Sequence, residues 1–422
     1  MIRIPAAVAA ALLALGAQAQ TPDPAAAPPA PAPAPKAEKR WVIAEKSNLS
    51  ISGRAWAEFH NVGADAGSVA GASKVPDRWR VHNNSSYLRI KGDIELVPGW
   101  KALAQIEAEF GIEGENGLPF SGTRNTGVGL SSPYGQLILG RWDSPMKQTT
   151  IGIDPFGGTG IFGYYNVFGQ QQVSPTGQGA NRWDRRLNNS LNYTSPDIYG
   201  LKILAAYSVG ETASAVAPKV NPWTASAALQ YKRGPLYVGV AYETRNDCGN
   251  PDADAPGGPS CSTAALGAAA QPLGTDTGLR VGASYDIKQT WTKLGVAYEH
   301  IDLMAKATAT LPKKTLQRDV YWGVITQGLM SNQHQIIVAY GMASDASGAN
   351  VWTGATGTKD TGASYLTAAY RFYFNKDTDL YAGYVQVKND KNASYRFGSG
   401  NFGAVPVGST STGYGAGIRY FF

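Results

Sequence analysis

Basic side chains at alternating positions are the residues of this 422-residue chain that are best placed to do chemistry. They are Arg54, Arg89, Lys91 and Arg141, each inside a stretch in which apolar and polar residues alternate. Gathered on one side of a narrow aqueous passage, such cations would attract anions and filter ions by sign. Each cation taken singly has a plainer alternative, a solvated wall residue of no special effect. The hypothesis is therefore that the four cations act together as a cluster.

One acid, Asp154, is the candidate counterpart of these cations. It lies in a Gly-rich and aromatic stretch, residues 151–168, that carries few other charges. We expect its carboxylate to lie opposite the basic cluster, at the narrowest point of the passage. Because a proline follows it, the alternative is a turn residue. The excess of bases over acids, with a formal net charge of +6, predicts a weak preference for anions.

Patterns for catalysis and for metal binding are weak in this sequence. Among its four histidines, His334 has serine and asparagine neighbours, and their spacing is more typical of a turn than of a nucleophile with its base. The sequence has no Gly-rich phosphate loop between a strand and a helix, and no Cys/His cluster with metal spacing. We therefore predict no enzyme activity, no cofactor and no metal site. Because the cations alternate with acids, the pattern does not indicate nucleic-acid binding.

The two cysteines, Cys248 and Cys261, flank a short polar stretch. In an oxidising compartment this arrangement predicts a disulfide. Closing a loop of this size contributes roughly 3 kcal/mol at most. We expect the disulfide to shape a loop rather than to hold the fold together.

The elements that must position these residues are strands with two different faces. In "YLRIKGDIELV", residues 87–97, the leucines and isoleucines fall on one parity, and the Arg, Lys, Asp and Glu residues fall on the other. On a helix the charges would be spread around the whole cylinder, whereas on a strand they separate completely. The segments "NLSISGRAWAEFH" and "LRVGASYDIK" repeat this pattern.

The spacing of such segments indicates how the whole chain is organised. We count about sixteen of them, joined alternately by short and by long connections. This rhythm predicts an all-β fold, a 16-stranded antiparallel transmembrane β-barrel with short periplasmic turns and long extracellular loops. The apolar parity would then face lipid and the charged parity the lumen. The alternative is a soluble all-β protein whose charged parity faces water.

The first 40 residues differ in composition from the rest. Residues 1–19 combine a cation at Arg3, an apolar stretch and a small-x-small site, which predicts a secretory signal peptide cleaved after Ala19. Residues 20–40 read as an Ala/Pro-rich tether. The barrel is expected to occupy residues 41–422.

Five stretches carry a family resemblance, namely "GDIELVPGWKALAQIEAEF", "SSPYGQLILGRWDSPMK", "RLNNSLNYTSP", "TDLYAGYVQVKNDKNASY" and "GIRYFF". In this order they resemble the trimeric general porins of Gram-negative bacteria, in particular the β-proteobacterial type. The resemblance implies a homotrimer in the lipid of the cell outer membrane that passes ions and small hydrophilic solutes by passive diffusion. Alternatives are a substrate-selective outer-membrane channel, or a surface adhesin or receptor barrel whose loops bind a partner.

The resemblance also implies roles for two segments. In the family, the loop after the fifth strand folds into the barrel and narrows it, and here it is residues 144–184. The last strand must pair with the first to seal the barrel, and Phe422 resembles the signal by which the barrel assembly machinery recognises its substrates. We expect loss of Phe422 to impair assembly more than it changes conductance.

Overall fold

The computed structural model describes residues 40–41, 46–113, 122–169, 183–210, 222–246, 274–305, 314–348, 358–397 and 402–422. These residues belong to one compact unit, Glu38–Phe422. Most of the regular structure in them is antiparallel strand. No helix of the described residues is long and apolar enough to cross a membrane.

In chain order the strands are β1 (Arg40–Trp41), β2 (Ser47–Ala64), β3 (Val75–Asn83), β4 (Tyr87–Val97), β5 (Trp100–Glu109), β6 (Gly122–Thr123), β7 (Thr126–Ser132), β8 (Gly135–Asp143), β9 (Arg186–Thr194), β10 (Leu201–Val209), β11 (Trp223–Arg233), β12 (Leu236–Asn246), β13 (Thr275–Ile287), β14 (Thr292–Ala305), β15 (Lys314–Leu329), β16 (His334–Ala343), β17 (Ala363–Asn375), β18 (Thr378–Asn389) and β19 (Thr410–Phe421). Between β8 and β9 lie the helix α2 (Pro145–Thr150) and the 3₁₀ turn η1 (Tyr164–Asn166).

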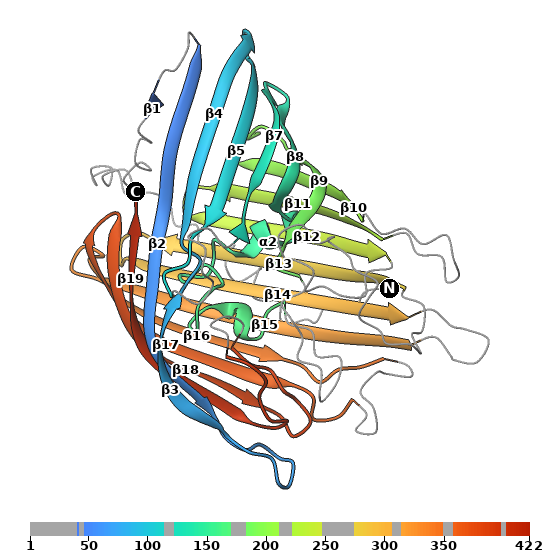
Figure 1. Ribbon diagram of the computed structural model, residues 1–422, viewed down its shortest axis with the longest axis vertical. Coiled ribbons are helices and arrows are strands. Elements are labelled where there is room, and N and C mark those ends of the chain that lie inside the picture. Colours follow the sequence, from blue (N-terminus) through green and yellow to red (C-terminus); the bar gives the residue numbers. More distant parts are fainter. Residues whose placement is uncertain are drawn as a thin grey trace. The chain divides into compact units, whose positions relative to one another are not determined.

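The strands form a closed 16-stranded antiparallel barrel, which confirms the predicted fold. β3 and β4 both pair with β2, and β6 and β7 both pair with β5, so each of these pairs fills one position in the ring. The last strand, β19, pairs with β2 from Ser411 opposite Ala64 to Phe421 opposite Arg54. Figure 1 shows β19 in red beside β2 in blue. Closure leaves no open sheet edge, as hydrocarbon surroundings require.

The two rims of the barrel carry different connections. On one rim, several hairpins turn through two residues, as at 98–99, 133–134, 234–235 and 376–377. The first connection on the other rim is shorter than the sequence suggests, because β2 continues to Ala64 and Val75–Asn83 pairs with it as β3. Within β3, Arg78, Arg80 and His82 alternate with the exposed Trp79 and Val81, but this run is short, and the hydrogen bonds to β2 are what make it a strand.

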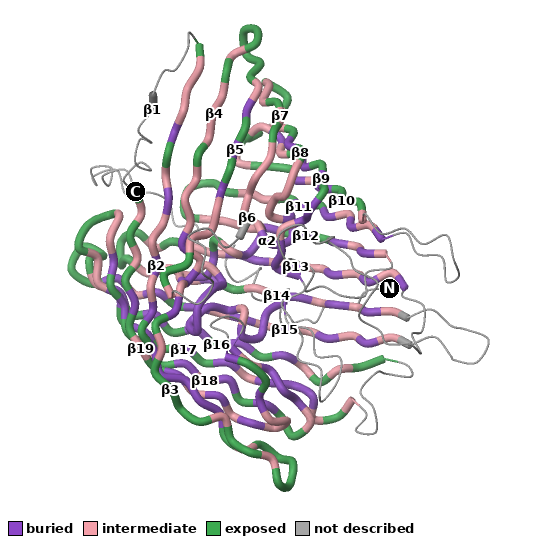
Figure 2. Tube along the Cα trace, in the orientation of Figure 1, coloured by how far each residue is buried: buried purple, intermediate pink, exposed green. Residues whose placement is uncertain are grey.

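The strands alternate between an exposed apolar face and a buried face. On β16 every second residue from Gln335 to Ala343 is buried, and the residues between them, such as Ile336 and Val338, are exposed. On β4, Ile90 is exposed, whereas Arg89 and Lys91 lie on the opposite, inward parity. Figure 2 shows this alternation along the strand tracks. Apolar side chains therefore cover the outside of the barrel.

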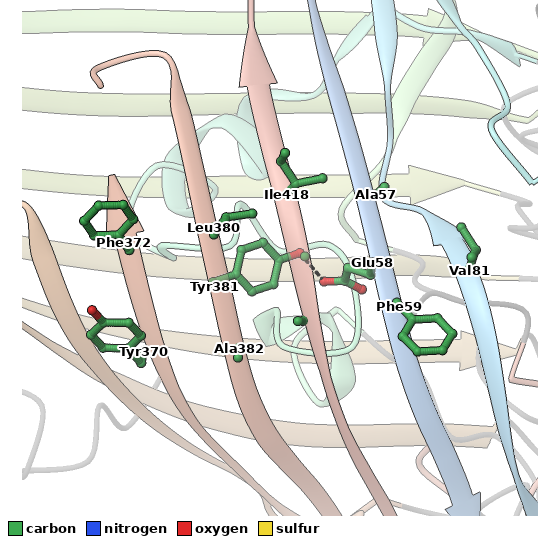
Figure 3. A pocket seen from close by; sticks show the side chains of 12 residues that line it. Ala57, Glu58, Phe59, Val81, Tyr370, Phe372, Leu380, Tyr381, Ala382 and Ile418 are labelled. Atoms are coloured by element: carbon green, nitrogen blue, oxygen red, sulfur yellow. Dashed lines mark hydrogen bonds between the residues drawn. The ribbon is translucent and has the colours of Figure 1, made fainter. Parts of the chain in front are cut away.

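A shallow apolar groove crosses the outer face near the β2–β19 seam. Phe59, Tyr370, Phe372, Leu380 and Ile418 line it, as Figure 3 shows, together with small residues of the neighbouring strands. Behind these strands, the Tyr381 hydroxyl donates to the Glu58 carboxylate over 2.6 Å (Figure 3). The barrel wall is thus one residue thick here, with an apolar outer surface and a polar inner one.

A β-bulge separates β3 from β4 and changes which residues face the lumen, from even-numbered ones such as His82 and Asn84 before it to odd-numbered ones such as Tyr87 and Arg89 after it. Residues 84–86 lie opposite only Ala55 and Trp56, because Asn83 pairs with Ala57 and Tyr87 pairs with Arg54. The Trp56 N–H donates to the Ser86 hydroxyl over 2.8 Å in place of a backbone partner. Bulges of this kind change the direction of side chains.

Candidate channel constriction

The described parts of the connection between β8 and β9, residues 144–169 and 183–185 and hereafter the inward loop, lie against the inside of the barrel. The loop begins with α2, where the Ser144 hydroxyl accepts the Lys147 N–H over 3.1 Å and Pro145 occupies the first turn, a favourable start for a helix. α2 contacts β11, β12 and β13. Tyr237 of β12 donates to the Thr149 carbonyl over 2.7 Å. The loop therefore crosses the lumen side of the wall from its first turn.

Apolar side chains hold the described part of the inward loop on the wall. Ile153 packs on two wall glycines, Gly282 and Gly295, where a Cβ atom would lie only 2.6 and 2.5 Å from it. Phe156 meets Tyr381 of β18 edge-on, with ring centroids 5.3 Å apart. The apolar loop side chains that are at most 1% exposed are Met146, Ile153, Phe156, Ile161, Phe162, Tyr164, Val167, Phe168 and Trp183. Burial of this much apolar surface fixes the loop.

The tip of the inward loop is bonded to β2 through a buried carboxylate. Glu58 accepts hydrogen bonds from Asn84 over 3.1 Å, from Tyr381 over 2.6 Å and from the Ile161 N–H over 3.4 Å. Thr159 of the loop donates to Asn84, which continues the inward face of β3, over 2.7 Å. The bulge and Glu58 together form the seat of the loop tip.

The far end of the inward loop is held by a buried ionic network. Arg280 of β13 pairs with both Asp184 of the loop and Glu299 of β14, and all three side chains are 0% exposed. Glu299 also accepts the Gly169 N–H over 2.9 Å and pairs with Arg318 over 3.1 Å. Because each carboxylate has a cationic partner, the network is stable despite its burial.

Asp154 lies within the inward loop and bonds to the loop backbone. Its carboxylate accepts N–H groups from Phe156, Gly158 and Tyr164, each over 2.9 Å, and the residue is 6% exposed. Burial raises the pKa of Asp154, although the three N–H donors oppose this shift. The geometry is that of the turn residue which the sequence left as an alternative.

Three of the basic residues meet at one aromatic ring on the lumen side. The guanidinium groups of Arg54, Arg89 and Arg124 lie 5.3, 5.2 and 4.9 Å from the ring centroid of Tyr87. Two of these arginines, Arg54 and Arg89, are residues that the sequence singles out. Arg124 precedes β7 and was missed, because it stands outside a regular alternating segment.

A second ring, Trp56, extends this group across the seam. Arg54 lies 4.6 Å and Arg419 5.0 Å from its centroid. Arg419 lies directly opposite Trp56 in the β2–β19 register. It also donates to the Pro155 carbonyl over 3.4 Å, which places the group beside the inward loop. We call the four residues Arg54, Arg89, Arg124 and Arg419 the basic arc.

Carboxylates neutralise part of the basic arc. Glu107 pairs with Arg89 over 2.7 Å and with Arg124 over 2.6 Å, and Asp379 pairs with Arg419 over 2.9 Å. Arg54 instead donates to the Ser85 carbonyl over 2.8 Å. In the part of the chain that the structure describes, Arg54 is the member of the arc that forms no ion pair.

The other two predicted basic residues lie elsewhere on the wall. Lys91 is partly exposed on β4, opposite Ser50 of β2. Arg141 lies at a register shift between β8 and β9, and its guanidinium donates to the Asn188 side chain. The structure thus brings Arg54 and Arg89 together at shared rings, whereas the contacts it gives for Lys91 and Arg141 are with other partners.

Several predicted features lie outside the described residues: the cleavage site at Ala19, the tether of residues 20–40 apart from β1, and the Cys248–Cys261 pair. These stay predictions. Within the described ranges, no group of three or more His, Cys, Asp or Glu side chains is placed to hold a metal ion.

Comparisons with known proteins agree with this architecture. The sequence profile of the Gram-negative porin family matches residues 6–392. Outer membrane porin protein 32 of Delftia acidovorans is 26% identical over 363 residues, covering 80% of this chain and 85% of that protein. The solved structure of the anion-selective porin from Comamonas acidovorans has a TM-score of 0.68 at 20% identity and covers 89% of this chain and 100% of that one. A trimer form of OmpT of Vibrio cholerae has a TM-score of 0.56 at 12% identity, with 89% and 99% covered.

A closed barrel with an apolar exterior, a charged interior and a loop packed inside defines a membrane channel. The chain belongs to the Gram-negative porin family. It is an outer-membrane protein, as the sequence predicts. The relatives named above are channels rather than enzymes.

Proposed function

We propose that this porin is a water-filled channel for passive diffusion of ions and small hydrophilic solutes, with a weak preference for anions. The observation that carries the preference is Arg54, a lumen-facing guanidinium held beside the inward loop without an ion pair among the described residues. The porin of Comamonas acidovorans that shares this fold is anion-selective, which agrees with the proposal.

The charges around Arg54 support the sign of the preference. Arg89, Arg124 and Arg419 of the basic arc, together with Arg371, form ion pairs with three carboxylates, Glu107, Glu109 and Asp379. With Arg54, which forms no ion pair among the described residues, the cations of this group outnumber its acids by two. Asp154 lies nearby, but its charge is bonded to three N–H groups. In a narrow aqueous passage with low-dielectric walls, such an excess raises the local anion concentration.

Reversal potentials in a KCl gradient across a planar bilayer test the preference. In the native channel we expect a reversal potential whose sign indicates anion selectivity. In Arg54→Gln we expect a reversal potential of the same sign and smaller magnitude. Arg233→Gln, which removes an exposed cation at a periplasmic turn, is the matched control and should leave the value unchanged. A cation preference that persists in Asp154→Asn contradicts the proposal. Conductance that saturates with one class of solute would indicate a substrate-selective channel, and a silent barrel would indicate a receptor or adhesin.

We propose further that the protein assembles as a homotrimer in outer-membrane lipid. The support is the family resemblance and the trimer form of OmpT of Vibrio cholerae, which has the same fold. Mass measurement of the detergent-solubilised native protein, before and after heating, tests this assembly. A native mass equal to one chain in detergent would contradict it.

A further inference from the structure

Arg54 lies between two aromatic rings on the lumen wall. Its guanidinium carbon is 4.6 Å from the Trp56 centroid and 5.3 Å from the Tyr87 centroid. Its one hydrogen bond among the described residues is to the Ser85 carbonyl, over 2.8 Å. Its Nε is buried without a hydrogen-bond partner. The two rings are therefore the main contacts that fix the position of this cation.

The register of the strands creates this arrangement. Tyr87 lies directly opposite Arg54 in the β2–β4 pairing, and Arg89 follows Tyr87 on the same face. On the other side of β4, Glu109 lies opposite Tyr87 and Glu107 opposite Arg89. Arg124 pairs with both of these carboxylates. One tyrosine ring thus stands at the meeting point of three guanidinium groups from three different segments.

A ring holds a cation in a way that a carboxylate does not. The face of an aromatic ring attracts a guanidinium through its quadrupole but carries no net charge. A carboxylate at the same place would fix Arg54 equally well, and it would also cancel the field that Arg54 projects into the lumen. Packing against rings leaves that field available to a passing anion.

We infer that Tyr87 is a positioning residue for the anion filter: its ring fixes Arg54 without neutralising it, beside Arg89 and Arg124, whose charges are paired with Glu107. This inference rests on the proposed anion preference and deepens it. The loss of the ring releases Arg54 from one of its two aromatic contacts. Loss of one cation–π contact corresponds to a roughly two- to fivefold decrease in the fraction of time that the Arg54 guanidinium spends in this position.

The test compares Tyr87→Leu and Tyr87→Phe with the native channel, by reversal potential in a KCl gradient. In Tyr87→Leu we expect the anion-to-cation permeability ratio to move toward one by about the same two- to fivefold factor. Tyr87→Phe keeps the ring face and should restore the native ratio. Tyr340→Leu, which removes an exposed tyrosine on the outer face of β16, controls for the loss of a strand tyrosine.

Two results overturn the inference: a native ratio in Tyr87→Leu, or an equal loss in Tyr87→Phe. If Tyr87→Leu fails to assemble, Tyr87→Met, whose flexible chain fills the space without a ring, takes its place. Arg54→Gln separates this inference from the proposed function. A native channel without anion preference refutes the proposed function. If Arg54→Gln changes the permeability ratio but Tyr87→Leu does not, only the role of Tyr87 is refuted.

Discussion

At the scale of single residues, the charge of Lys147 depends on its neighbours at the root of the inward loop. Its ammonium group pairs with Asp143 over 2.8 Å, and Arg186 pairs with the same carboxylate over 3.3 Å. Asn125 donates to Asp143 over 2.8 Å. Burial, together with the positive charge of Arg186, lowers the pKa of Lys147 to about 8. This lysine therefore loses its charge within a pH range in which the arginines keep theirs.

The pH dependence of ion selectivity follows from this pKa. Between pH 7 and pH 9 Lys147 loses its proton, so one positive charge disappears beside the lumen and anion preference should fall. In Lys147→Met the fall over this range should be absent. Reversal potentials at both pH values measure it, with Lys376→Met, at an exposed turn, as the control. An identical pH profile in the native channel and in Lys147→Met would contradict this interpretation.

The pH dependence of stability should have the opposite sign: as Lys147 loses its proton, anion preference falls but the free energy of unfolding rises. The pKa of a lysine in the unfolded chain is about 10.4, so between pH 8 and that value the unfolded state binds more protons than the folded state. The free energy of unfolding contributed by Lys147 therefore rises with pH in this window. The difference between the native protein and Lys147→Met isolates this contribution.

At the scale of elements, the inward loop is held at three places that differ in chemistry. Its tip bonds to Glu58, its middle packs apolar side chains on the wall, and its far end joins the ionic network around Arg280. The tip contacts are two hydrogen bonds, from the Ile161 N–H to Glu58 over 3.4 Å and from the Thr159 hydroxyl to Asn84 over 2.7 Å, whereas the far end has two carboxylates around one guanidinium. We expect the far end to be the stronger attachment.

Replacing Arg280 by methionine tests the strength of this attachment. The change keeps much of the side-chain volume but leaves Asp184 and Glu299 without their shared cation in a buried site. Removing one partner of a buried ion pair costs about 3–5 kcal/mol. Arg280→Met should therefore unfold at a lower temperature and show noisier single-channel current. Arg233→Met, at an exposed turn, is the control, and an unfolding temperature equal to the native one would refute this role of Arg280.

At the scale of the whole molecule, the seam between β2 and β19 closes the barrel. Phe422 extends the pairing by one residue, because its N–H donates to the Gly53 carbonyl over 3.2 Å and its carbonyl accepts the Gly53 N–H over 2.9 Å. Beyond this point, β2 pairs with β1, with Arg40 opposite Ser50. The Phe422 ring also lies over Gly53, where a Cβ atom would be 2.4 Å from it. The seam thus depends on Phe422 and on the absence of a side chain at position 53.

Deleting Phe422 should impair assembly more than conductance. The deletion removes two seam hydrogen bonds and the ring over Gly53, but it leaves the basic arc and the inward loop unchanged. We expect a lower yield of assembled protein in the outer membrane, with near-native conductance for the channels that do form. Phe374→Ala, an exposed aromatic at a periplasmic turn, is the control for loss of a phenylalanine. A normal yield without Phe422 would refute the prediction.

The sequence by itself determined the barrel and its orientation. Alternation at period two, as in residues 87–97, can be read locally, because successive side chains of a strand point to opposite faces whatever the strand pairs with. The strand number and the asymmetry of the connections follow from the same pattern. β3 was missed because its alternating run, Arg78 to His82, is short and has only Trp79 and Val81 on its apolar face.

Only the tertiary structure decided which charges meet. Strands in a barrel are tilted and staggered, so residues equally far from the ends of their strands do not lie at equal heights. The β2–β19 register places Arg419 and Arg54 at the same ring, Trp56, a contact that the sequence of neither strand shows by itself. The partners of Asp154 are N–H groups that meet only once the loop is folded. Contacts between strands depend on register and stagger, which are properties of the closed barrel and not of any one segment.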